Sequence, residues 1–186
     1  MLDNFFKVTK FIPKIVEKTV YDIDFNKLYE EGKRYILFDL DNTLLPYDVP
    51  FADEKLRNLL STLKQLGYRI LILSNNSNQR VTDFCNDVDL PCITKAKKPL
   101  KKGYKQALKK LLCTNKEEVI SVGDQMMTDI LGSNRSNIES ILVKPLKKSN
   151  EKWYTKLNRK SEKHAIKRIK KYNYNIYKEI EEKHEY

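Results

Sequence analysis

Hydrophobic residues fall in two alternating patterns along the chain, and together they predict a series of strands and helices. Short apolar runs that stop at polar or turn-forming residues predict strands at 35–38, 69–73, 92–94, 119–122 and 140–143. Apolar residues that recur every three or four positions predict helices at 53–67, 81–88, 99–112 and 129–135. Because strands and helices alternate, we expect a three-layer, Rossmann-like α/β fold built on a mostly parallel, five-stranded sheet.

Two acidic residues follow the first predicted strand directly. Asp39 and Asp41 stand two positions apart, so an extended backbone projects both side chains from one side while Leu40 points away. Open α/β sheets keep their ligand sites at the carboxyl ends of the strands, where this pair is placed. Two neighbouring carboxylates repel unless a cation or a proton lies between them. Taken alone, the pair fits a strand end with solvated acids equally well.

Further polar residues follow later strands in a fixed order. They are Ser74 and Asn75 after the second strand, Lys98 before a helix-starting proline, and Asp124 and Asp129 after the fourth strand. Together with Asp39-Leu40-Asp41-Asn42-Thr43, they resemble the four motifs of the haloacid dehalogenase (HAD) superfamily: D-x-D-x-T, a Ser or Thr, a Lys, and G-D-x-x-x-[TS]-D. The resemblance covers roughly residues 35–143. Four ordered matches in the expected strand-end context are far more specific than any single motif.

The resemblance implies a phosphatase that works through an aspartyl-phosphate and uses Mg²⁺. Asp39 is then the nucleophile and a metal ligand, and the Asp41 backbone carbonyl and the Asp124 carboxylate complete the protein ligands. The Asp41 side chain protonates the departing alkoxide and later deprotonates the attacking water. Family members that do not hydrolyse phosphate esters usually carry another residue at the second position, so Asp41 favours a phosphohydrolase.

The remaining motif residues are expected to handle the phosphoryl group. By the same resemblance, Ser74 and Lys98 hold the transferring oxygens, Thr43 and Asn75 line the substrate site, and Asp129 orients Lys98 or a metal-bound water. Lys97 is the competing assignment for the motif lysine, but the family places this lysine directly before the helix, which favours Lys98. For Asn75 and Asn76, a polar turn at the strand end is the competing interpretation.

The spacing between motifs leaves no room for an inserted cap domain. Residues 42–52 separate Asp41 from the next helix, and residues 76–97 are taken up by the predicted helix and short strand. We therefore expect an open site. Capless enzymes of this superfamily tend to need a large substrate, a surface or a partner subunit to exclude water. Lipid, nucleic acid, protein, and a small molecule handled by an oligomer remain open as substrates.

Positive charge is concentrated in two stretches of a chain whose net charge is +11. Residues 95–110 hold eight lysines and no acid, and residues 144–186 hold 14 basic against 6 acidic residues with aromatic residues interleaved. Such a balance indicates an anionic partner such as phospholipid, nucleic acid or a phosphorylated substrate. A solvated, partly disordered tail is the alternative for the second stretch.

We divide the chain into three parts: an amphipathic segment at 1–32, a phosphatase core at 33–146, and a basic tail, helical or partly disordered, at 147–186. The first segment either docks on the core or attaches to a membrane interface through residues such as Phe5, Phe6 and Phe11. It contains no apolar run long enough for a signal peptide or a membrane span. Three cysteines without C-x-x-C spacing indicate reduced, packed thiols. We therefore expect a cytoplasmic, peripherally membrane-associated protein, or a matrix protein if it is mitochondrial.

A closer resemblance rests on the F-D-L-D-N-T-L start, the G-D-Q-x-x-T-D motif and the tail Trp153-Tyr154-Thr155-Lys156-Leu157. These features are similar to YqeG-like proteins of the capless HAD subfamily IIIA, which resemble mitochondrial-type phosphatidylglycerophosphate phosphatases. The favoured function is removal of the terminal phosphate of phosphatidylglycerophosphate at a membrane surface. A capless phosphatase acting on nucleic-acid ends or phosphoproteins is one alternative, and a basic RNA- or ribosome-binding module on a HAD scaffold is another. The intact pair of carboxylates argues against the last, because a scaffold has no need of it.

Overall fold

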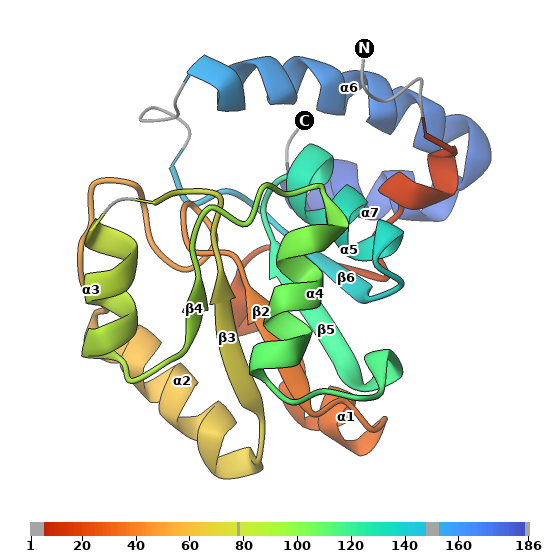
Figure 1. Cartoon of the computed structure of the whole chain (residues 1–186). Coiled ribbons are helices and arrows are strands. Elements are labelled where there is room, and N and C mark those ends of the chain that lie inside the picture. Colours follow the sequence, from red (N-terminus) through yellow and green to blue (C-terminus); the bar gives the residue numbers. More distant parts are fainter. Residues whose placement is uncertain (1–5, 78, 148–152, 185–186) are drawn as a thin grey trace.

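The computed structural model describes residues 6–77, 79–147 and 153–184, with side chains for all of these except 153–160. Six parallel strands form one central sheet, in the order β1-β6-β5-β2-β3-β4 (Figure 1). They are β1 (Ile15–Glu17), β2 (Tyr35–Phe38), β3 (Arg69–Leu73), β4 (Cys92–Ile93), β5 (Val119–Gly123) and β6 (Glu139–Val143). The predicted α/β fold with a parallel sheet is confirmed. The predicted count of five strands was one short, because β1 adds an edge strand beside β6.

Helices flank the sheet on both faces (Figure 1). They are α1 (Phe25–Glu30), α2 (Glu54–Leu66), α3 (Gln79–Asp87), α4 (Lys101–Lys110), α5 (Leu131–Arg135), α6 (Trp153–Tyr172) and α7 (Tyr174–His184). Three 3-10 turns, η2 (Val8–Phe11), η3 (Val20–Asp22) and η4 (Lys116–Glu118), and one π-helical turn, η5 (Met126–Ile130), complete the described elements.

Local sequence signals explain where α2 begins and ends. The side chain of Asp53 accepts a hydrogen bond from the Leu56 backbone N–H at 2.8 Å, which caps the first turn. Gly67 ends the helix in the left-handed region, with a φ of 103° that other residues rarely adopt. Leu56, Leu60 and Leu63 lie on one face and are buried against the sheet. Burial of each such side chain contributes about 1.5–3 kcal/mol.

Alternation along β2 distributes its side chains between the two faces of the sheet. Ile36 and Phe38 pack in the cluster beneath α1, α2 and α3. Leu37 points the other way, into the cluster that α4 covers. All three side chains are completely buried, as expected for the central strand of a three-layer fold. This burial fixes the register of β2, because a slip of one residue would exchange the two faces.

A third apolar cluster packs the segment that contains Phe11 and Val16 against the tail. Phe11 and Val16 pack with Ile169 of α6 and Ile180 of α7, and all four are completely buried. The Lys183 ammonium, in addition, donates to the Val16 carbonyl and pairs with Glu17 at 3.0 Å. Of the two alternatives for this segment, docking on the rest of the chain therefore holds for Phe11, and its predicted role at a membrane interface was wrong, because its side chain is completely buried in the cluster with α6 and α7. Phe5 and the side chain of Trp153 lie outside the described part.

The tail also crosses the edge of the sheet where the strands end. In Figure 1, α6 runs above the carboxyl ends of the strands. Glu162 of α6 is completely buried and accepts a hydrogen bond from the Met126 backbone N–H at 2.7 Å. This contact joins α6 to η5, the turn that follows β5. No cap is inserted in the core, since residues 42–52 form a loop without a helix or strand, but the tail makes this edge less open than the sequence predicted.

Candidate active site

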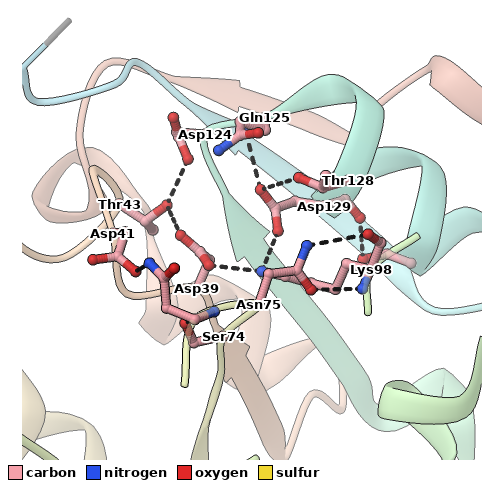
Figure 2. Close-up of polar contacts among 12 residues, drawn as sticks. Asp39, Asp41, Thr43, Ser74, Asn75, Lys98, Asp124, Gln125, Thr128 and Asp129 are labelled. Carbon is pink, nitrogen blue, oxygen red and sulfur yellow. Dashed lines mark hydrogen bonds and ion pairs between the residues drawn. The ribbon is translucent and has the colours of Figure 1, made fainter. Parts of the chain in front are cut away.

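Two neighbouring strands bring the first and last acidic motifs together. β2 and β5 are hydrogen-bonded partners, and the Asp39 N–H extends the ladder by donating to the Val122 carbonyl at 2.9 Å. Asp39 and Asp124 therefore leave adjacent strand ends, and Asp129 reaches the same place from η5 (Figure 2). One carboxylate oxygen from each of these three residues lies within 4.8 Å of the others, and all three residues are buried. The sheet topology accounts for this convergence.

A left-handed turn brings Thr43 back toward the carboxylates. Asn42 has a φ of 65°, a conformation that asparagine tolerates better than most residues. The Asn42 N–H donates to the Leu45 carbonyl at 2.7 Å, which closes the turn. The Thr43 hydroxyl then lies 3.1 Å from Asp39 Oδ2 and 3.3 Å from Asp124 Oδ1. Thr43 therefore links two of the three residues that the sequence assigned to the metal, Asp39 and Asp124.

The Lys98 ammonium lies between two of the clustered carboxylates. Its ammonium donates to Asp39 Oδ1 and to Asp129 Oδ1, each at 2.6 Å, and its side chain is 3% exposed. Lys97, the competing assignment, is exposed and has a φ of 55°. The structure thus brings Lys98, and not Lys97, to the predicted site.

Burial and charge oppose each other in this cluster. Burial alone would lower the pKa of Lys98, but the carboxylates of Asp129 and Asp39 outweigh it and hold that pKa above its usual range. For Asp39, burial raises the pKa to about 7, and the nearby carboxylates of Asp129 and Asp41 add to the rise while Lys98 opposes it. Lys98 therefore stays charged, and the site favours a cation near Asp39.

Asp129 is held in place on every side. Its Oδ2 accepts from the Gln125 N–H at 3.1 Å and lies 3.3 Å from the Thr128 hydroxyl, while Oδ1 faces Lys98 (Figure 2). Its backbone carbonyl accepts from the hydroxyl of Ser133 at 2.7 Å. The π-helical turn Met126–Ile130 places the Asp129 side chain next to the N–H of Gln125, the residue that precedes the turn. Asp129 can therefore orient the Lys98 ammonium, the role that the sequence assigned to it.

Gly123 leaves room for the Asp129 carboxyl group, which yields a prediction. A Cβ at position 123 would lie 2.4 Å from Asp129 Cβ and Cγ, so the Asp129 side chain would have to move. We expect Gly123→Ala to reduce phosphatase turnover by roughly 10-fold, because small displacements of positioned groups slow catalysis. Steady-state kinetics tests this, with melting temperature recorded for both proteins. Unchanged turnover in a folded variant would show that the position of Asp129 is not critical.

The residues after β3 form hydrogen bonds with the backbone of Lys98 and with one another. Asn75 brackets the Lys98 backbone: its Oδ1 accepts from the Lys98 N–H at 2.6 Å and its Nδ2 donates to the Lys98 carbonyl at 3.1 Å. Ser74 is buried, and its hydroxyl oxygen accepts from the Asn76 N–H at 3.0 Å. Asn75 thus acts on the site through the backbone of Lys98. It therefore combines the two interpretations that the sequence left open, a residue of the site and a polar residue that holds the turn after the strand.

Asp41 lies apart from the three clustered carboxylates, at the opposite end of the row from Lys98 (Figure 2). Its Oδ1 accepts from Arg80 Nη1 and its Oδ2 from Asn76 Nδ2, both at 2.5 Å. Arg80 was not predicted as a site residue, whereas for Asn76 the sequence left open a place in the site or a polar turn. A signal for Arg80 existed, because it is the one basic residue between positions 70 and 94 and it stands six positions after Ser74.

The donor set fits a small divalent cation. Three buried carboxylates converge, and hard oxygen atoms are the ligands that Mg²⁺ prefers. Asp39 and Asp124 are the predicted ligands, and Asp129 joins them in the cluster although it also faces Lys98. The side chain of Asp41 is turned toward Arg80, so only its backbone carbonyl remains for the predicted ligand role.

Comparison with known proteins identifies the class. The family model of haloacid dehalogenase-like hydrolases matches residues 47–137. The putative HAD-hydrolase YfnB from Bacillus subtilis shares the fold, with a TM-score of 0.51 and 14% identity over 64% of this chain and 90% of that one. The chain belongs to the haloacid dehalogenase-like hydrolases.

Two curated relatives narrow this class to phosphatases. The chain is 34% identical to the probable phosphatase YqeG of Bacillus subtilis (strain 168), over 92% of this chain and 95% of that protein. It is 26% identical to phosphatidylglycerophosphate phosphatase 1, chloroplastic/mitochondrial, of Arabidopsis thaliana, over 84% of this chain but only 47% of that protein. The chain is therefore a phosphatase of the YqeG-like group, and the predicted resemblance is confirmed.

Proposed function

We propose that this phosphatase is a Mg²⁺-dependent phosphomonoester hydrolase that converts phosphatidylglycerophosphate to phosphatidylglycerol at a membrane surface. The observation that carries the chemistry is the contact of Lys98 with both Asp39 and Asp129, beside Asp124. This arrangement supports a carboxylate nucleophile, a fixed positive charge and a set of oxygen ligands in one buried cluster. The similarity to YqeG and to the Arabidopsis phosphatase supports the choice of substrate.

Asp39 is the group that attacks phosphorus. Attack by one of its oxygens forms the aspartyl-phosphate and breaks the bond to the leaving alkoxide. Lys98 offsets negative charge on the transferring phosphoryl oxygens, and Asp129 keeps the ammonium in position. Asp39, Asp124 and the Asp41 carbonyl would hold Mg²⁺, which when bound reduces the repulsion between the phosphate and the carboxylates.

Asp41 serves the leaving group and the water. It gives a proton to the departing alkoxide, and it then takes one from the water that hydrolyses the aspartyl-phosphate. The second transfer leaves Asp41 protonated again. In the resting structure both Asp41 oxygens accept hydrogen bonds, from Arg80 and from Asn76, so the carboxylate has to turn away from these donors and take up a proton from solvent before it can protonate the alkoxide.

A phosphate-release screen tests the proposed function. We would compare phosphatidylglycerophosphate in vesicles, oligonucleotides with 3′ and 5′ phosphates, phosphopeptides and sugar phosphates, each with Mg²⁺ and with excess EDTA. We expect the lipid to give the highest kcat/KM, and EDTA to abolish release from every substrate. Full activity in EDTA would contradict the metal requirement. Faster release from oligonucleotides or phosphopeptides would replace the lipid with that substrate.

The exposed face of α6 supports the membrane part of the proposal. Lys163, Lys167 and Lys171 recur every four residues, are exposed and point away from the buried cluster. Such residues contribute about 1 kcal/mol each near an anionic bilayer. No described helix is both long enough and apolar enough to cross a membrane. Attachment through surface charge is therefore the mode that these residues favour.

Co-sedimentation with vesicles tests attachment by this face. We expect replacement of Lys163, Lys167 and Lys171 by glutamate to weaken binding to phosphatidylglycerol vesicles by roughly 100-fold. Deleting the termini would be less informative, because the described parts of both pack in one core cluster. The matched control replaces three exposed lysines at the amino edge of the sheet, Lys14, Lys27 and Lys116. Equal losses in both variants would show only nonspecific charge attraction.

A further inference from the structure

Arg80 makes three contacts with the region around Asp41. Its Nη1 donates to Asp41 Oδ1 at 2.5 Å, its Nη2 to the Pro46 carbonyl at 2.7 Å and its Nε to the Val49 carbonyl at 2.8 Å. The Arg80 side chain is 13% exposed and that of Asp41 is 6% exposed. The guanidinium is thus a mostly buried cation. The Arg80 side chain extends from the first turn of α3 to the loop after β2.

Asn76 completes the environment of the Asp41 carboxylate. Its Nδ2 donates to Asp41 Oδ2 at 2.5 Å, while its own N–H donates to Ser74 Oγ and its carbonyl accepts from the Lys95 N–H. The backbone of Asn76 is therefore fixed, and its amide side chain is directed at Asp41. Arg80 and Asn76 together present two donors to one anionic group.

These two donors lie next to Asp41, the residue that serves the leaving group in the proposed reaction. Asp41 is the residue that serves the leaving oxygen, so the rest of the leaving group must extend from Asp39 past Asp41. Arg80 and Asn76 both donate to the Asp41 carboxylate, so they lie next to that path. A planar guanidinium binds the two free oxygens of a phosphate ester as readily as those of a carboxylate. The donors that hold Asp41 at rest therefore suit a second anionic group of the substrate.

We propose that Arg80 and Asn76 form a second anion subsite, which exchanges the Asp41 carboxylate for a phosphodiester of the substrate and so frees Asp41 to turn toward the leaving oxygen. The substrate class is a phosphomonoester whose alcohol also carries a phosphodiester, joined through glycerol. The inference rests on the proposed function, because the head group of phosphatidylglycerophosphate has this structure. Exchange of one anion for another keeps the buried guanidinium paired throughout.

The competing role for Arg80 is to anchor the loop at 46–49, since two of its contacts are to carbonyls there. A loop anchor would affect all substrates alike. A subsite would affect only substrates that carry the second anion, and a lysine in place of the arginine would restore part of the effect. The contrast between substrates therefore separates the two roles.

The test compares three soluble substrates with wild-type enzyme, Arg80→Gln, Arg80→Lys and Asn76→Ala. Glycerol 3-phosphate and the deacylated head group of phosphatidylglycerophosphate differ by the phosphodiester part, and p-nitrophenyl phosphate has a leaving group that needs no proton. We expect the wild type to favour the head group over glycerol 3-phosphate by roughly 10- to 100-fold in kcat/KM, through both KM and kcat, because glycerol 3-phosphate leaves Asp41 held by Arg80. We expect Arg80→Gln to remove this preference and Arg80→Lys to restore part of it. Arg57→Gln, which breaks a surface pair with Asp87, is the control.

Two results would overturn the subsite. One is a wild-type enzyme that shows no preference for the head group while it hydrolyses p-nitrophenyl phosphate. The other is an equal loss on all three substrates in Arg80→Gln and in Arg80→Lys, which would assign Arg80 to the loop. Failure of the lipid proposal looks different: the head group preference persists and depends on Arg80, but phosphatidylglycerophosphate in vesicles is hydrolysed no faster than the oligonucleotides or phosphopeptides.

Discussion

Replacing Asp39 with asparagine is expected to abolish turnover, with a loss of roughly 10⁴-fold or more. An amide of nearly the same size keeps the packing but cannot attack phosphorus. No neighbouring carboxylate is placed to act as the nucleophile instead. Asp124 and Asp129 are held by other contacts, and Asp41 faces Arg80. Release of inorganic phosphate from p-nitrophenyl phosphate with Mg²⁺ provides the measurement. A trapped phosphoenzyme on wild-type protein should be missing from the variant.

Two further variants serve as comparisons for Asp39→Asn. Asp89→Asn, in the exposed turn after α3, removes a carboxylate far from the cluster and should leave turnover unchanged. Asp41→Asn should slow hydrolysis of alkyl phosphates by about 10² to 10⁴-fold, the usual contribution of a general acid, and should slow p-nitrophenyl phosphate less. Substantial turnover by Asp39→Asn would contradict an aspartyl-phosphate at this position.

The second large effect is expected at Lys98. Lys98→Ala removes the ammonium that lies 2.6 Å from both Asp39 and Asp129, and it leaves these buried carboxylates without that partner. We expect a loss of transition-state stabilisation on the order of 3 kcal/mol. Folding stability should also fall, by about 3–5 kcal/mol, because breaking a buried ion pair strands the remaining charge. Steady-state kinetics and urea denaturation measure the two losses separately.

Lys97→Ala is the matched control, since it removes an exposed lysine one position away. It should change stability by less than about 0.5 kcal/mol, as surface substitutions usually do, and should leave kcat nearly intact. Added Mg²⁺ should restore part of the stability of Lys98→Ala if the same carboxylates bind the ion. A larger catalytic defect at position 97 than at position 98 would reverse the assignment.

The core of the fold could be predicted because its signals are local. β2, β3 and β5 are short runs made mostly of apolar residues, and Asp53 and Gly67 mark the ends of α2. β1 escaped prediction for the opposite reason. It is three residues long, and its strand conformation comes from pairing with β6, more than 120 positions away. Its apolar residues therefore resembled an amphipathic segment.

The site shows the same division between local and distant signals. The four motifs identify Asp39, Asp124 and Lys98, and the order of the strands explains why these residues meet. The contacts of Arg80 and Glu162 depend on side chains that cross between elements. Glu162 stands in a lysine-rich tail, and no sequence pattern there predicts that it is buried or that it accepts a hydrogen bond from the Met126 N–H. Such contacts follow from packing and not from sequence spacing.

The pairing of β1 with β6 and α7 also sets an order of events during synthesis. β1 leaves the ribosome before the rest of the sheet, yet its strand partner β6 is made near the end of the core and α7 is made after that. Domains generally fold as the chain emerges, so β2, β3 and β5 can assemble while β1 waits. Until α7 arrives, one edge of the sheet and the apolar side chains of Phe11 and Val16 stay uncovered. The nascent chain therefore has an interval in which a chaperone that binds apolar segments would protect it from aggregation.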